Sequence, residues 1–311
     1  MSRYEMLPAH PFHDFLYSVA GREIRMGDTI TFLSEVDLTE VEQVRAATAM
    51  RGASKPTYTA FVAKAVALAL REFPYANRRL YRRFWLPFSR LRLQQFNSCD
   101  ITVAVERHLP ETAAGVFIDV LRDVDRKSLL EITAWLRALA ACDATNNRQW
   151  REVLWLVTRL PAWLSSLLAR LPLLFPRLWC KYRGGAALIS SPAKYGVDVV
   201  VGAWSAPLGV SFGLVKDRPV VRAGKVVPCR TFTLTLNWDR RVMAGAQAAF
   251  FYKRVVDLLE HALTELAPPD VAPQEKAPAF RVMRRERIQR ESLAQVAVEA
   301  VAENHGTSTS D

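Results

Sequence analysis

The sequence predicts an α/β fold, and three segments carry this prediction. Residues 231–236 alternate threonines with large apolar side chains, which is the period-two pattern of a strand. A helix is expected directly afterwards, from Gly245, because apolar residues then recur at three- and four-residue spacing. Residues 57–73 show the same helical spacing and stop at Pro74, which cannot continue a helix. Strands and helices therefore share one chain.

The segments between these three are assigned from the same two periodicities and from turn residues. Apolar runs on either side of a glycine indicate a hairpin, and a hydroxyl ahead of a helical pattern indicates a helix cap. The expected elements are strands at 28–38 and 97–105, a helix capped by Thr39, a helix from Ser128 to about Cys142, and a hairpin over 219–227 that turns at Ala223-Gly224.

The composition allows a sizeable core, since half of the 311 residues are hydrophobic. The formal net charge of +11 comes largely from arginine clusters such as Arg78-Arg79, which suit phosphate groups of a small cofactor or an anionic membrane surface. A nucleic-acid partner is not favoured, because the sequence shows no zinc-finger, helix-turn-helix or aromatic RNA-binding motif. Four separated cysteines predict reduced thiols and no metal site. The N-terminal residues lack a signal-peptide pattern, so a cytoplasmic location is expected.

Residues 146–183 form an apolar helical insert that is rich in tryptophan and leucine. Arginines and prolines interrupt this run too often for a transmembrane helix, which needs about 20 mostly apolar residues. Two interpretations remain open. The insert forms two or three short helices packed on the domain, or it is an interfacial membrane segment or a cover for an apolar substrate.

Two parts of unequal size are expected along the chain. Residues 1–267 are predicted to form one domain that contains the insert. Residues 268–311 begin with a proline-rich stretch typical of a flexible linker, and an amphipathic pattern further on allows a C-terminal helix.

The strand at 231–236 ends in a charged turn that reads Asp239-Arg240-Arg241-Val242-Met243-Ala244-Gly245. This segment resembles the Asp-His-Arg-Val-x-Asp-Gly motif of the catalytic domain of 2-oxoacid dehydrogenase complex acyltransferases (dihydrolipoamide acyltransferases). Chloramphenicol acetyltransferase is similar to that family in fold. Further similar stretches lie at 74–77, 115–131, 184–198 and 219–227, so the resemblance covers roughly 28–263 apart from the insert. Two positions differ, because Arg240 replaces the catalytic histidine and Ala244 replaces the second aspartate.

The resemblance implies a two-layer sandwich with a central mixed sheet and helices on one side, as in chloramphenicol acetyltransferase. A homotrimer is implied, because the family's site lies between chains. The family also implies a coenzyme A thioester as acyl donor and a separate lipoyl or other acyl-carrier protein as partner. The sequence shows no lipoyl domain, so a stand-alone domain without a covalently bound lipoyl group is expected.

Six residues at and near the motif are carried over as candidates from the family's positions. In the family, a serine or threonine holds the oxyanion, and Ser190 occupies that position. Without the family, two serines in a glycine-rich strand indicate a structural role, and the charges at 239 and 241 indicate an ion pair. The candidate catalytic residues are Ser190, Asp239 and Arg240, and the candidate cofactor-binding residues are Ser191, Asn237 and Arg241.

Acyl transfer between thiols needs a base, an oxyanion donor and a channel for both thiols. A guanidinium cannot accept the thiol proton, so we expect ordinary transfer to be weakened or lost. His10, His13, His108 and His261 are weighed as replacement bases and are not favoured. Two alternatives remain. Arg240 stabilises a thiolate or clamps a carboxylate in an active acyltransferase, or the chain is a membrane-surface or scaffold protein that acts through residues 150–180.

Overall fold

The computed structural model describes residues 3–8, 29–81, 90–109, 112–143, 145–161, 164, 168, 171–202, 204 and 206–267. The chain divides into two compact units, Met1–Ala272 and Pro273–Asp311. All described residues belong to the first unit. The predicted linker and C-terminal helix at 268–311 lie outside the described residues, and the boundary at 267 stays a prediction.

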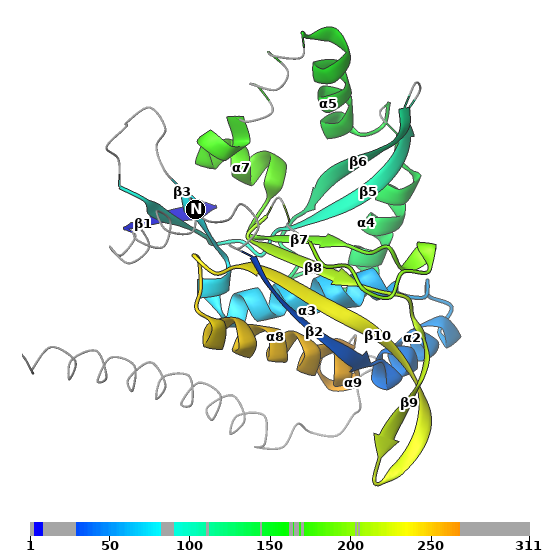
Figure 1. Cartoon of the computed structure of the whole chain (residues 1–311). Coiled ribbons are helices and arrows are strands. Elements are labelled where there is room, and N and C mark those ends of the chain that lie inside the picture. The colour runs from blue at the N-terminus through cyan, green and yellow to red at the C-terminus, as the bar shows by residue number, and fades with distance from the viewer. Residues whose placement is uncertain are drawn as a thin grey trace, which may run out of the picture. The chain divides into compact units, whose positions relative to one another are not determined.

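A seven-stranded sheet forms one layer of the domain (Figure 1). Two neighbouring pairs, β5 with β7 and β7 with β8, are parallel, and the other pairs are antiparallel, so the sheet is mixed as predicted. In spatial order the strands are β2 (Thr29–Asp37), β10 (Lys225–Asp239), β8 (Leu208–Phe212), β7 (Ala187–Ser190), β5 (Ile101–Leu109) and β6 (Thr112–Leu121), and β9 (Lys216–Arg222) pairs with β10.

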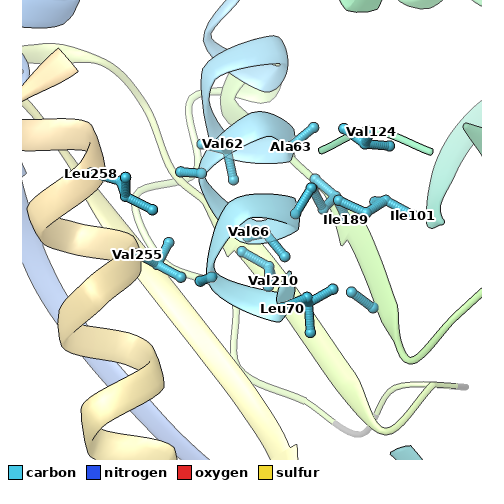
Figure 2. Packing of buried hydrophobic residues seen from close by; sticks show 14 of the residues in the cluster. Val62, Ala63, Val66, Leu70, Ile101, Val124, Ile189, Val210, Val255 and Leu258 are labelled. Carbon is cyan, nitrogen blue, oxygen red and sulfur yellow. The ribbon is translucent and has the colours of Figure 1, made fainter. Parts of the chain in front are cut away.

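Helices form the second layer on one face of this sheet. Figure 2 shows the centre of the contact, where Val66 lies among side chains that include Val255 and Val210. These side chains come from two helices and a strand and belong to one continuous buried cluster. The predicted two-layer architecture is therefore confirmed. The helices are α2 (Thr39–Met50), α3 (Tyr58–Glu72), α4 (Leu129–Ala141), α8 (Gly245–Glu260) and α9 (Ala262–Glu265).

The helix ends follow from local hydrogen bonding. Thr57 caps α3 by accepting from a backbone amide of the first turn at 3.2 Å, and Ser128 forms a capping box with Glu131 at the start of α4. The prediction that Thr39 caps α2 is wrong by position, because Thr39 is the first helical residue. The Asp37 carboxylate accepts from the Thr39 backbone N–H at 2.9 Å and from its hydroxyl at 2.6 Å. A carboxylate two residues upstream thus satisfies the first amide of the helix.

A smaller three-stranded sheet lies beside α7 (Pro176–Arg183) of the insert. Its strands are β1 (Tyr4–Pro8), β4 (Arg92–Phe96) and β3 (Arg78–Tyr81), in that spatial order. Two 3₁₀ turns, η1 (Pro74–Ala76) and η2 (Ala193–Tyr195), lie before β3 and after β7. The strand expected at 97–105 begins later, at Ile101, because the preceding Asp100 carboxylate is buried and accepts from the Asp123 backbone N–H at 2.9 Å.

The insert forms short helices, of which α5 (Arg148–Arg159) is the longest described. Trp150 and Trp179 are buried and attach the insert to the domain. Val153, Trp155, Leu173 and Phe175 remain exposed. Within the described part of the chain, no helix combines the length and the apolar character needed to cross a membrane.

The predicted hairpin joins β9 and β10. Its turn is Ala223-Gly224, and both residues have positive φ angles of 48° and 76°. Such angles suit glycine and the tight turns of antiparallel hairpins. Residues 225–230 of β10 pair with β9, whereas residues 231–239 pair with β2, so the hairpin extends past the body of the sheet (Figure 1).

Candidate functional site

The charged motif turn begins at the last residue of β10. Asp239 accepts the backbone N–H of Val242 on its own carbonyl at 2.9 Å, which closes the turn. The Arg241 side chain donates from Nε to Asp239 Oδ1 and from Nη2 to Oδ2, both at 2.9 Å. The Arg241 backbone N–H also donates to Oδ1 at 2.9 Å. The Asp239 carboxylate is therefore held on both oxygens by Arg241, which is the ion pair that the sequence indicated.

Arg240 lies between these two residues at the tip of the turn. Its side chain is exposed, and within the described residues it forms no hydrogen bond or ion pair. The neighbouring carboxylate of Asp239 is already satisfied by Arg241. The charge of Arg240 is thus available to a ligand, but a guanidinium has no lone pair with which to accept a proton.

Asn237 lies two residues before the turn, inside β10, and is 1% exposed. The Thr31 hydroxyl donates to Asn237 Oδ1 at 2.6 Å. Asn237 Nδ2 is buried and finds no hydrogen-bond partner in the part of the chain that the structure describes. This candidate cofactor-binding residue therefore has an unused donor, but it lies beneath the surface and not on the exposed turn.

The two candidate serines lie at the end of β7 and differ in their contacts. The Ser191 hydroxyl donates to the Phe212 carbonyl at 2.8 Å and accepts from the Ala193 backbone N–H at 3.3 Å. Ser190 is half-buried, and its hydroxyl has no hydrogen bond among the described residues. Ser191 thus fixes the local backbone, and Ser190 keeps a hydroxyl available for a ligand.

The structure does not bring Ser190 and Arg240 together within one chain. Ser190 is opposite Ser211 of β8, and Ser211 is opposite Thr235 of β10. Asp239 follows Thr235 by four residues along β10. With strands about 4.8 Å apart and a rise of about 3.4 Å per residue, this register places Ser190 about 17 Å from Asp239 at the start of the motif turn. The candidates therefore form two separate groups on one sheet.

Between these groups lies a buried polar surface, on the sheet face opposite the helices. It is formed by Thr233, Thr235, Asn237 and Ser211, all buried. Trp204 packs against this face, at Gly209 of β8.

The contact between Trp204 and β8 is close. The Trp204 indole lies so near Gly209 that a Cβ at this glycine would be 2.2 Å from Trp204 Cγ. Ser211 Oγ and Trp204 Nε1 are buried without hydrogen-bond partners in the described residues. The sequence prediction missed both residues. Gly209 inside a strand was the available signal, because such a glycine often marks a close approach.

Histidines do not supply a base at the described part of this site. His261 is at the far end of α8 from the motif turn, about 24 Å away for a helix of this length. Its Nδ1 lies 2.9 Å from the Asp257 carbonyl oxygen. His10, His13 and the side chain of His108 lie outside the described residues. The described part of the chain also holds no cluster of three or more potential metal ligands.

The chain matches the family model for the "2-oxoacid dehydrogenases acyltransferase (catalytic domain)" over residues 27–152 and 181–267. These two ranges span more than half of the chain. The chain belongs to this acyltransferase family. The interval between the two matched ranges falls inside the insert predicted at 146–183. The family prediction is thereby confirmed.

Individual relatives of the acyltransferase family agree with this assignment. The chain is 24% identical over 237 residues to the lipoamide acyltransferase component of the branched-chain alpha-keto acid dehydrogenase complex of Pseudomonas aeruginosa, covering 75% of this chain and 46% of that protein. It thus spans less than half of that relative's length.

Solved structures support the fold. The dihydrolipoamide acetyltransferase of Azotobacter vinelandii superposes with a TM-score of 0.55 at 24% identity, covering 81% of this chain and 88% of that one. That structure was solved to investigate the role of a serine, a histidine and an asparagine in its catalytic mechanism. The cubic core of the pyruvate dehydrogenase multienzyme complex superposes with a TM-score of 0.55 at 24% identity, covering 83% of this chain and 92% of that one. The predicted fold class is confirmed.

Proposed function

We propose that this domain is a coenzyme A-dependent acyltransferase-family protein in which ordinary acyl transfer between thiols is lost or heavily weakened. The observation that carries the proposal is Arg240, exposed at the tip of the motif turn where the family motif has its histidine. A general base must accept the thiol proton, and a guanidinium cannot. Removing a general base costs about 10²–10⁴ in rate.

The other half of the site is retained in this proposal. Ser190 has a free hydroxyl that can donate to an oxyanion, as the serine of the family does. Because the strand register separates Ser190 from the motif turn by about 17 Å in one chain, a complete site in this proposal takes residues from two copies. This separation supports a homotrimer with the site between chains. Coenzyme A thioester as donor, and a separate lipoyl or other acyl-carrier protein as acceptor, complete the proposal.

A transfer assay with acetyl-CoA and dihydrolipoamide tests this function. The wild type is expected to show little turnover, and Arg240→His is expected to raise the rate by about 10²-fold or more. Arg240→Gln is the matched control, because it removes the charge without adding a base, and it is expected to gain nothing. Robust turnover by the wild type would overturn the proposal.

A second candidate function rests on the free charge of Arg240. Because Arg241 already neutralises Asp239, Arg240 can hold a thiolate or grip a carboxylate in an active acyltransferase. Calorimetry with coenzyme A is expected to show saturable binding that Arg240→Ala weakens. Binding of equal strength in the wild type and in this variant would contradict the second function.

A third candidate is a membrane-surface or scaffold role of residues 150–180. The exposed side chains of Trp155, Leu173 and Phe175 favour it. Co-sedimentation with anionic lipid vesicles is expected to fall in a Trp155→Ser, Phe175→Ser double variant, which leaves the buried Trp150 and Trp179 in place. Equal sedimentation of both proteins would exclude these side chains as the anchor.

A further inference from the structure

A buried arginine, Arg79, lies between the small sheet and helix α7 of the insert. The residue is 5% exposed and belongs to β3. Its Nε donates to Gln94 Oε1 at 2.7 Å, and its Cζ lies 4.1 Å from the centre of the Trp179 ring and 5.5 Å from that of Tyr81. Its Nη1 makes a long contact of 3.4 Å with the Leu173 carbonyl. The guanidinium is thus held in place mainly by neutral groups.

The charge of this guanidinium is not balanced by a carboxylate in the described part of the chain. Arg79 forms no ion pair there, and its Nη2 is buried without a hydrogen-bond partner. Burial lowers the pKa of Arg79 to about 10, so the group stays cationic at neutral pH. Burial also raises the pKa of the neighbouring Cys180 thiol to about 11, so this thiol is neutral and does not serve as a counter-ion.

The buried carboxylate of the same region is already occupied. Asp100 Oδ2 accepts from Arg3 Nη1 at 3.0 Å and from Arg122 Nη1 at 2.8 Å. Its other oxygen accepts the Asp123 backbone N–H. Two arginines therefore share one carboxylate here, and no charge remains for Arg79. An unpaired buried charge is unfavourable, so its presence calls for a counter-ion.

We propose that Arg79 anchors a binding site for a monocarboxylate with an apolar body. The free Nη2 and the weakly engaged Nη1 form one edge of the guanidinium fork, and this edge matches the two oxygens of a carboxylate. A single buried cation balances one negative charge. A phosphate dianion would bring a second charge into surroundings formed by aromatic rings, and that charge would remain unpaired.

The surroundings also select the rest of the ligand. The rings of Trp179 and Tyr81 flank the guanidinium, and Leu173 and Phe175 are exposed. Leu173 joins the two environments, because its carbonyl contacts Arg79 while its side chain is 48% exposed. An alkyl chain that extends from Arg79 past Leu173 would cover apolar surface on both sides.

This site lies between β3 and the insert and does not depend on acyl transfer at the motif turn. Leu173 and Trp179 both lie in the interval between the two ranges that match the family. The inference therefore survives if Arg240 proves to have no catalytic role. The proposed transferase activity likewise survives if no carboxylate binds at Arg79.

Calorimetric titration of the full chain with acetate, butyrate, hexanoate and octanoate tests the proposal. Saturable binding is expected, with affinity rising about fourfold per added methylene. Two compounds serve as controls in competition with octanoate. Octanol has the apolar chain but no charge, and inorganic phosphate has the charge but no apolar chain. Neither is expected to compete with octanoate.

The decisive variant is Arg79→Met, with Arg78→Met as its matched control. Arg78 is the adjacent residue on the opposite face of β3, and its Nε donates to Gln95 Oε1 at 2.8 Å. Arg79→Met is expected to lower octanoate affinity by about tenfold or more, because a charged hydrogen bond is lost. Arg78→Met is expected to leave the affinity unchanged.

Thermal unfolding adds a second measurement. Octanoate is expected to raise the melting temperature of the wild type and of Arg78→Met, but not that of Arg79→Met. If Arg79→Met does not fold, Arg79→Lys keeps the charge without the fork and is expected to bind octanoate more weakly than the wild type. The proposal is overturned if the wild type shows no saturable binding, or if neither Arg79 variant weakens it.

Discussion

The two faces of the central sheet are both buried, but by different means. On the helix side, Phe232 and Leu234 of β10 pack in the continuous apolar cluster beneath α3 and α8. On the opposite side, Thr235 and Asn237 of the same strand are buried on the face against which Trp204 packs. One strand therefore takes part in two kinds of packing.

The difference between the two faces shows where this domain depends on hydrogen bonds. The apolar face is stabilised mainly by burial and leaves one donor, Trp238 Nε1, without a partner among the described residues, whereas the polar face leaves three such groups, Ser211 Oγ, Trp204 Nε1 and Asn237 Nδ2. Buried polar groups without partners cost stability. We infer that the apolar face determines the fold, and that the polar face keeps donors near the candidate site at a cost.

The largest effect is expected on the apolar face. Phe232→Ala removes a ring that is almost fully buried and lies 5.1 Å from the ring of Phe212, and it should lower the free energy of unfolding by about 3–5 kcal/mol. Urea denaturation measures this. Val221→Ala on the exposed hairpin is the control and should change the free energy of unfolding by less than about 0.5 kcal/mol. Similar losses in both variants would contradict the assigned core.

A smaller effect is expected where Trp204 packs on the polar face. Gly209→Ala places a methyl group against the Trp204 indole and should cost about 1–3 kcal/mol, because the ring must shift. Urea denaturation of Gly209→Ala, alone and combined with Trp204→Ala, tests whether the indole causes this loss of stability. Removing the indole should relieve the effect of the alanine, and an unchanged cost would show that the ring is not responsible.

The polar face itself should tolerate a single substitution better than the apolar face. Thr235→Val keeps the shape but removes a hydroxyl that donates to the Ser211 carbonyl at 3.3 Å. A loss of about 1 kcal/mol is expected. A loss as large as that of Phe232→Ala would remove the proposed distinction between the faces.

The smallest effect concerns pH at the edge of the sheet. Burial raises the pKa of Asp37, but hydrogen bonds from Thr39 and Arg222 outweigh it, so the pKa lies below its usual value. The stability that this carboxylate contributes is therefore present above the unfolded-state pKa, near 3.9, and is lost as pH falls through the lower folded-state value. The wild type should therefore lose this contribution to its stability in acid. Asp37→Asn should flatten this part of the pH profile, and an unaltered profile would contradict the assignment.

Much of the fold could be predicted from the sequence, because its signals are local. The helical spacing of 57–73, the stop at Pro74 and the turn at Ala223-Gly224 are confirmed. The start of the strand at 97–105 was misplaced, because the hydrogen bond that holds Asp100 comes from Asp123, far along the chain. The periodicity of a sequence does not predict a hydrogen bond between residues so far apart in the chain.

The candidate site was less accessible to sequence analysis. The motif turn was located, since Asp239 and Arg241 are close in sequence, and their ion pair is present. The burial of Thr235 and Asn237 was missed, because no periodic pattern in the sequence around Trp204 indicated that this face is covered. The pair Arg78-Arg79 was noted in the sequence, but the burial of Arg79 was missed. A four-residue strand is too short to show which of two adjacent arginines faces inward.

The length of β10 has a mechanical consequence. This one strand is 15 residues long, or about 50 Å when extended, and it connects the tip of the projecting hairpin to Asp239. Residues 225–231 are paired with β9, and residues 231–239 continue into the sheet on β2, so the hydrogen-bonded ladder is unbroken from one end of the strand to the other. A molecule that binds the hairpin would therefore contact one end of the strand whose other end carries the charged turn.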